Sequence, residues 1–271
     1  MIEDNRIYFL KCFLLVSFFK YCLLFLSFFS KLTTMVLLGL SIAPGLAICL
    51  YIFLKDIYNK EPKRLLLFSF FLGILSIIPP YFIETYSFNL FNTSIPSLAT
   101  LAFCVVALSE ELSKFFVVRY FCFPQKRFDE PLDGIVYSVM VSMGFATIEN
   151  VNYVFTHGYS TAFVRMFLSV PAHATFGVVM GYFIGKAKFD SANRFKYLFT
   201  GLLVAVLFHG TFDFFIFLQA NEAIHSYVSD GLLFVGAVVS YIIAILLSRK
   251  HLKLHRQLSK QLFKPDPNQN V

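Results

Sequence analysis

The chain has 271 residues, of which 58% are hydrophobic and only 14% are charged. Soluble domains are about half apolar and about a quarter charged, so this composition excludes an ordinary soluble protein. The net charge of +7 does not indicate nucleic-acid binding, because the Lys and Arg residues lie in short segments between apolar runs, as in membrane proteins.

Eight apolar runs are long enough to cross a bilayer as helices, which takes about 20 residues each. In chain order they lie at 9–30, 34–54, 65–86, 97–120, 134–156, 165–186, 197–219 and 230–248. Each run is predicted to be a helix, since a lone strand would leave its backbone unpaired in lipid. We therefore predict an all-α membrane protein, a polytopic bundle of about eight transmembrane helices.

From residue 55 onward, segments with basic residues alternate with segments that have none. The segments 55–64, 119–127, 186–196 and 249–264 carry Lys and Arg, whereas 87–96, 157–164 and 220–229 carry neither. The positive-inside rule therefore predicts that the basic loops and the C-terminus are cytoplasmic.

Three parts are expected along the chain: an extra N-terminal hydrophobic segment at 1–34, a helical bundle at 35–248 and a basic cytoplasmic tail at 249–271. The first part contains Lys11 and Lys20. It is a true helix with snorkelling lysines, a signal-like segment, or an overextended start with the working protein beginning near Met35. We favour the true helix.

Ionisable side chains inside the bilayer cost roughly 2.5–3.5 kcal/mol each on insertion scales, so they indicate function. Here they gather on four consecutive spans: Glu110, Glu111 and Lys114 on the fourth, Glu149 on the fifth, His173 on the sixth, and His209 and Asp213 on the seventh. Asn150 follows Glu149, and Arg165 stands at the outer end of the sixth span. Glu84, near one end of the third span, stands apart from this group.

Helical spacing predicts how these side chains meet. Glu110 and Lys114 are four residues apart and share a face, whereas Glu111 is rotated by about 100° from Glu110. One Glu is therefore expected to pair with Lys114 while the other, Glu111, faces the cavity. His209 and Asp213 are also four apart, so each is a candidate metal ligand, or the Asp orients the His.

Small residues on the sixth span indicate which way its histidine points. Ser169, His173, Gly177, Gly181 and Gly185 recur every four residues. Small residues at this spacing let helices approach closely in lipid. The face that carries His173 is therefore expected to point into the bundle.

At these residues the sequence resembles the PrsW family of intramembrane proteases, a distant relative of the CAAX prenyl-protein endopeptidases. The matching elements are SEELSK at 109–114, which contains an EExxK motif, an FxxxE motif within 133–150, Arg165, PAHATFGVVMG at 171–181, FHGTFD at 208–213, which contains an HxxxD motif, and the upstream stretch 43–64. The resemblance covers roughly residues 35–220.

The resemblance implies hydrolysis of a peptide bond in a membrane-anchored protein, within or beside the bilayer of a bacterial-type cell membrane. Relatives cut anti-sigma factors anchored in the membrane and are usually grouped as metalloproteases. We expect Glu110, Glu111 and Glu149 to be catalytic, His173, His209 and Asp213 to bind Zn²⁺, and Lys114, Asn150 and Arg165 to support them. Glu149 is an alternative third ligand, with Glu110 or Glu111 as the general base.

Three other interpretations stay open at this stage. In a metal-free mechanism the Glu pair activates water directly and a His stabilises the oxyanion. A CAAX-type prenyl-protein endopeptidase is the nearer alternative enzyme, although that group tends to have a His where this chain has Glu149. An ion- or proton-coupled transporter also buries Glu, His and Asp, but more often shows inverted repeats and broken helices.

Overall fold

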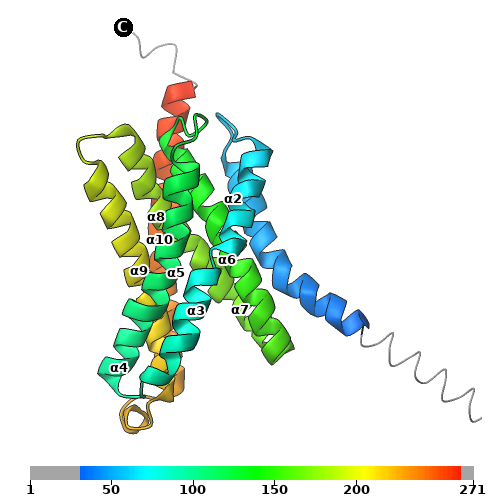
Figure 1. The fold of residues 1–271 in the computed structure, drawn as a ribbon, viewed down its shortest axis with the longest axis vertical. Helices are drawn as coiled ribbons and strands as arrows, with labels where there is room; N and C mark the ends of the chain where they lie inside the picture. The colour runs from blue at the N-terminus through cyan, green and yellow to red at the C-terminus, as the bar shows by residue number, and fades with distance from the viewer. Residues whose placement is uncertain (1–30, 264–271) are drawn as a thin grey trace, which may run out of the picture.

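The computed structural model describes residues 31–263, so the predictions for 1–30 and 264–271 lie outside the described residues. Between 31 and 263 the regular elements are helices, and no strand occurs there (Figure 1). Six helices are long and apolar enough to cross a membrane: Lys31–Lys55, Lys63–Leu90, Pro131–His157, Tyr159–Phe189, Arg194–Ala220 and Asp230–Phe263. The all-α membrane fold is thus confirmed, but the number of about eight spans is not.

The predicted fourth span is helical but irregular. It consists of α4 (Ile95–Thr100), a π-helical stretch (Leu101–Ala107), α5 (Leu108–Val117) and a second π-helical stretch (Val118–Cys122). Together they run along the length of the bundle (Figure 1). Departures of this kind from regular α-helix are frequent at functional sites.

Two of the long spans are divided by local breaks. The first contains α2 (Lys63–Leu75) and α3 (Ile78–Ser87), and the Pro79–Pro80 pair lies in the first turn of α3. Proline is tolerated there because the first helical N–H groups lack intrahelical partners, but its ring cannot continue the helix from α2. The second contains α7 (Tyr159–Phe167) and α8 (Ser169–Phe189), which Leu168 separates.

The central element is α6 (Pro131–His157), which is buried over most of its length. It begins with Pro131 at its first position and ends at His157, before Gly158, whose φ of +79° favours glycine. Gly181 of α8 lies so close to the backbone of Gly134 of α6 that a Cβ would collide with it. The small-residue face of α8 therefore points into the bundle, as predicted from its spacing.

The remaining long helices are α9 (Arg194–Phe217) and α10 (Asp230–Phe263). The predicted last span ends at 248, but α10 continues through the first part of the predicted basic tail. His251 and His255 of this extension are buried, and the His251 ring stacks on Tyr182 of α8 with 3.8 Å between centroids. The tail therefore begins as a helix packed on the bundle.

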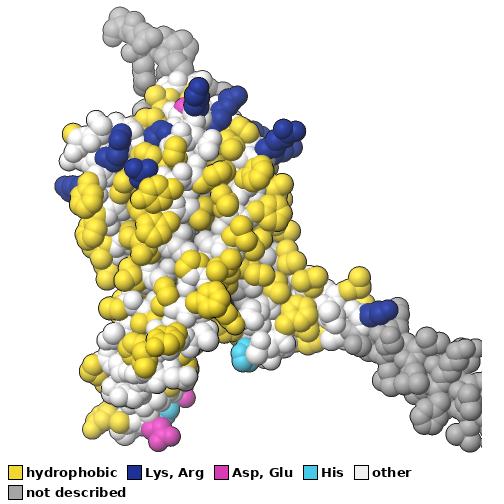
Figure 2. Space-filling model, in the orientation of Figure 1, with side chains coloured by type: hydrophobic (Ala, Val, Ile, Leu, Met, Phe, Trp, Pro, Cys, Tyr) yellow, Lys and Arg dark blue, Asp and Glu magenta, His cyan; other side chains and the backbone are white. Residues whose placement is uncertain are grey.

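The surface is suited to lipid around the middle of the bundle. Large hydrophobic side chains such as Phe68, Leu207 and Leu246 are exposed. Figure 2 shows apolar side chains over most of this face, with Lys and Arg concentrated at one end and acidic side chains visible at the other. This charge asymmetry is typical of membrane proteins.

Candidate active site

Helix α5 supplies three charged side chains that are buried together. Lys114 is 1% exposed, and its Nζ lies 3.0 Å from Glu110 Oε2 and 2.8 Å from Glu111 Oε1. The expectation that Lys114 holds one Glu and leaves the other free is therefore wrong. On a helix, a residue is the neighbour of both the residue three positions and the residue four positions before it. Lys114 therefore reaches both carboxylates.

The two histidines reach this group from neighbouring helices. His173 of α8 places Nδ1 3.1 Å from Lys114 Nζ, and His209 of α9 places Nδ1 2.9 Å from Glu111 Oε1. The imidazole centroids are 5.0 Å apart and the rings are nearly perpendicular. Both rings are buried. Acids and imidazoles from three helices thus converge as predicted.

A second carboxylate holds the outer nitrogen of each imidazole. Nε2 of His173 lies 3.0 Å from Glu149 Oε2 on α6, and Nε2 of His209 lies 3.2 Å from Asp213 Oδ2 one turn along α9. Each ring therefore bridges an inner charged group and an outer acid. Such outer carboxylates fix the orientation of an imidazole and raise its basicity as a ligand.

Glu149 is itself held by a polar chain that crosses three elements. Arg165 of α7 places Nη2 2.8 Å from Glu149 Oε2 and donates from Nε to Asn150 Oδ1 at 3.0 Å. Asn150 in turn donates to the carbonyl of Ser41 at 2.9 Å. Arg165 and Asn150 therefore support the acid behind His173, and this chain ties helix Lys31–Lys55 to the site.

Glycine at position 210 lets the π-helical stretch Leu101–Ala107 approach α9 closely, next to His209. A Cβ at Gly210 would collide with the ring of Phe103. The ring of Phe176 stacks on His209 from another side, with centroids 5.0 Å apart. The stacked Phe176 ring limits the positions that the nitrogens of His209 can adopt.

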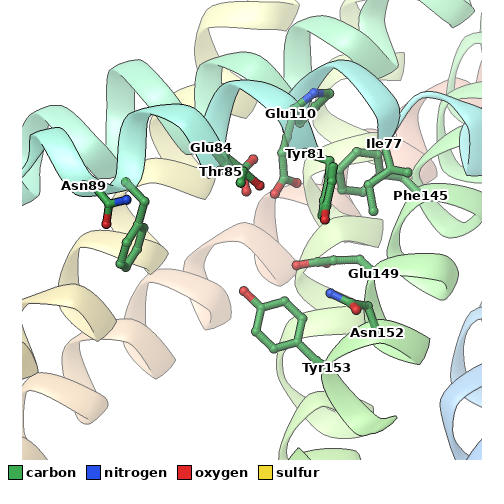
Figure 3. Close-up of a pocket in the computed structure, with 12 residues that line it drawn as sticks. Ile77, Tyr81, Glu84, Thr85, Asn89, Glu110, Phe145, Glu149, Asn152 and Tyr153 are labelled. Carbon is green, nitrogen blue, oxygen red and sulfur yellow. The ribbon is translucent and has the colours of Figure 1, made fainter. Parts of the chain in front are cut away.

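A cavity of about 410 Å³ opens onto these groups. The polar residues in its lining are Glu84, Glu110, Glu149, Tyr153, Arg165, Ser169, His173, His209 and Asp213. Glu110, and not Glu111, lines this cavity, so the expectation for Glu111 is wrong. In the adjoining opening, Glu84 and Glu110 lie on one side and Glu149 and Tyr153 on the other (Figure 3).

Glu84 is the carboxylate of the cavity lining that the sequence did not assign to the site. It lies on α3, lines both openings, and its Oε1 is buried without a hydrogen-bond partner. The available signal was a lone carboxylate in an apolar span. Its position near the end of that span concealed its proximity to the site.

Four of these side chains have the donor atoms and spacing of a metal site. One ligand atom from each of Glu110, Glu111, His173 and His209 lies within 4.8 Å of all the others. In addition, Glu111 Oε2 is buried without a hydrogen-bond partner. Two imidazoles with carboxylates are a donor set that suits zinc and similar ions. The residues present therefore fit a divalent metal.

Comparison with known proteins identifies the family. The model of the PrsW family of intramembrane metalloproteases matches residues 61–252. The chain belongs to this family. It is 42% identical over 180 residues to "Protease PrsW" of Geobacillus kaustophilus, which covers 66% of this chain and 79% of that protein. It is 41% identical over 186 residues to "Protease PrsW" of Bacillus subtilis, covering 68% and 84%. No solved structure matches.

The resemblance noted in the sequence is thus confirmed, and the protein is an integral, multi-pass membrane enzyme of the intramembrane protease class. The family is described as metalloproteases, in agreement with the buried Glu and His group that can hold a metal. Neither a transporter nor a prenyl-protein endopeptidase is favoured by these matches.

Proposed function

We propose that the protein hydrolyses a peptide bond of a membrane-anchored protein with water activated by Glu110, assisted by Glu111, beside a divalent metal, in the first instance Zn²⁺. The observation that carries this proposal is the convergence of two carboxylates and two imidazoles from α5, α8 and α9 on one buried point. A purely structural cluster has no need of a cavity, yet Glu110 and both imidazoles line one.

Glu110 is the better candidate for the general base. It is the member of the Glu pair that faces the cavity, so water can approach its carboxylate. A base must lie within hydrogen-bond reach of the proton it abstracts. Glu111 is fully buried between Lys114 and His209, so we assign it a role in holding these two groups.

His173 and His209 would bind the metal, and the carboxylates of Glu110 and Glu111 would lie beside it. When bound, a divalent ion of this kind polarises a carbonyl and lowers the pKa of bound water. Asp213 was predicted as a ligand and Glu149 as catalytic. Their contacts with the outer imidazole nitrogens favour an orienting role for both. Lys114 compensates the charge of the two inner carboxylates.

The substrate class follows from the position of the cavity in the bundle. The helices that form the cavity also have lipid-facing surfaces, which suits a substrate that spans the membrane once. Such a substrate would be of the anti-sigma-factor kind that the family resemblance implies. The cavity-lining residues Phe88, Phe217 and Phe234 lie towards the ends of helices that border the loops without Lys or Arg. With basic loops and the C-terminus cytoplasmic, cleavage would occur nearer the opposite side.

Cleavage of a single-span reporter by purified protein in liposomes tests the proposal. Glu110→Gln and His173→Ala should each abolish cleavage, and His173→Ala should also lose bound metal, whereas Glu222→Gln in an exposed loop should retain both. Cleavage at the wild-type rate by Glu110→Gln would remove this residue from the mechanism. Full activity after complete metal removal would instead support the metal-free mechanism, in which the Glu pair acts alone.

A further inference from the structure

A second group of carboxylates lies far along α6 from Glu149, where loops join the helices. One carboxylate oxygen from each of Glu61, Asp129 and Asp133 lies within 4.8 Å of the other two. Glu61 belongs to the loop before α2, Asp129 to the loop before α6, and Asp133 to the first turn of α6. Residues separated by about seventy positions are thus brought together by the fold.

The side chains in this group are held in fixed positions. Asp133 Oδ2 accepts hydrogen bonds from the backbone N–H groups of Asp129 and Glu130, both at 2.9 Å. The hydroxyl of Tyr137 donates to Glu61 Oε2. The side chain of Asn59 donates to Asp129 Oδ1 at 2.7 Å. Each of the three carboxylates therefore has a donor that orients it, as ligands of a preformed site require.

Some carboxylate oxygens in and beside this group have no hydrogen-bond partner. Asp133 is 0% exposed, and its second oxygen, Oδ1, has no hydrogen-bond donor. The same is true of Oδ1 of the fully buried Asp56, whose Oδ2 accepts the N–H of Glu61 at 2.9 Å. Buried acceptors are nearly always satisfied in native proteins, so each of these oxygens is available to a ligand.

Positive side chains act on the group at longer range, Lys60 on Asp56 and Lys188 on Asp129 and Asp133, without pairing with it. Within 31–263, no Lys or Arg forms an ion pair with Asp56, Glu61, Asp129 or Asp133; the ion pairs found there lie elsewhere. Burial, with a further contribution from Asp56 and Asp129, raises the pKa of Glu61 to about 7. The carboxylates are therefore held close together at an electrostatic cost that a cation would relieve.

We propose that Glu61, Asp129 and Asp133, with Asp56 beside them, bind a hard divalent cation, Mg²⁺ or Ca²⁺, at a site separate from the active site. The donor atoms are all oxygens, which these ions prefer, whereas the active site offers imidazole nitrogens. The ion would join the loop before α2 and the loop before α6 to the first turn of α6. Because α6 also carries Glu149, the site would hold the central helix in place.

Thermal unfolding of the full chain in detergent, first freed of metals, tests this inference. Ca²⁺ and Mg²⁺, titrated separately, should raise the melting temperature by a few degrees, because a ligand that binds the folded state stabilises it. Glu61→Gln and Asp129→Asn should need at least about tenfold more cation for the same rise. Asp129 is exposed, so Asp129→Asn keeps the fold intact.

Two further variants separate this site from the active site. Glu222→Gln, in an exposed loop, and His173→Ala, in the active site, should both keep the wild-type response to Ca²⁺. Loss of cleavage in His173→Ala with an unchanged Ca²⁺ response would leave both sites as proposed. An equal response in wild type, Glu61→Gln and Asp129→Asn, or no response in wild type to either ion, would overturn the second site.

Discussion

Lys114 and His173 are in direct contact, with 3.1 Å between Nζ and Nδ1. An ammonium group only donates, so the hydrogen-bond network assigns the ring proton of His173 to Nε2, which faces Glu149 at 3.0 Å. The lone pair of Nδ1 then points into the group formed by the inner carboxylates. This is the atom of His173 that would bind a metal ion, and the ammonium of Lys114 lies in its direction.

The outer carboxylates should therefore control metal affinity without touching the metal. We expect Glu149→Gln and Asp213→Asn each to lower metal affinity or cleavage by about 10- to 100-fold while the fold is retained, because outer partners of histidine ligands act at this level. Metal content and cleavage of a single-span reporter measure the effect. Wild-type affinity in both variants would contradict an orienting role.

Removing the buried ammonium should destabilise the metal-free protein. Lys114→Met leaves Glu110 and Glu111 uncompensated, and breaking a buried ion pair in this way costs about 3–5 kcal/mol. Added metal should recover part of this loss, since a bound cation would also compensate the two carboxylates. Melting temperatures with and without metal test this, with the exposed Lys126→Met as the matched control. Equal losses in the two variants would contradict the assignment.

Contacts within one helix could be predicted from the sequence because helical geometry fixes them. The pairs Glu110–Lys114 and His209–Asp213, each four residues apart, are in contact at 3.0 Å and 3.2 Å. The inward direction of the His173 face also followed from the recurrence of small residues. These features depend only on spacing.

Contacts between helices could not be predicted, because they depend on how the bundle closes. The pairing of Glu111 with His209 and of His173 with Glu149 joins residues on different helices. Glu84 reaches the cavity because α3 begins anew at the Pro79–Pro80 pair. The carboxylates of Glu61 and Asp133 meet because two loops fold over the start of α6, and no local pattern indicates this.

Because α8 packs closely on α6, replacing a glycine at their contact with alanine should destabilise the protein far more than the same replacement at an open position. Gly181→Ala should destabilise the protein by about 1–3 kcal/mol, because a Cβ would strike the backbone of Gly134 and force the helices apart. Gly39→Ala in helix Lys31–Lys55 is the control, since its Cβ would meet nothing within 4 Å. Thermal unfolding in detergent measures both, and equal melting temperatures would contradict the packing argument.

Glu84 should contribute to activity without affecting metal content. Its side chain lines the cavity beside Glu110 and has one buried oxygen without a hydrogen-bond partner, but Glu84 is not one of the four residues whose ligand atoms cluster. We expect Glu84→Gln to lower kcat/KM by about tenfold or more, as for a residue that handles water or a proton, with bound metal unchanged. Metal loss alongside activity would instead place Glu84 in the support of the metal site.

The second acidic group predicts a specific dependence of stability on pH. Glu61 has a pKa of about 7 in the folded protein, above the ordinary value of 4.5, so the folded state binds its proton more tightly than the unfolded state. In metal-free buffer this residue's favourable contribution is complete below pH 4.5 and is lost as the pH rises towards 7. Glu61→Gln should lack this change.

The comparison of wild type with Glu61→Gln measures what this carboxyl contributes, including its coupling to the neighbouring acids. In metal-free buffer the melting temperature of wild type should fall relative to Glu61→Gln between pH 4.5 and 7. Saturating Ca²⁺ should reverse the trend, since the ionised carboxylate binds the cation and the neutral one does not. The groups that surround Glu61, namely Asp56, Asp129, Asp133 and Tyr137, are the same in both proteins. A constant difference across this range, with and without Ca²⁺, would show that Glu61 neither titrates nor binds as inferred.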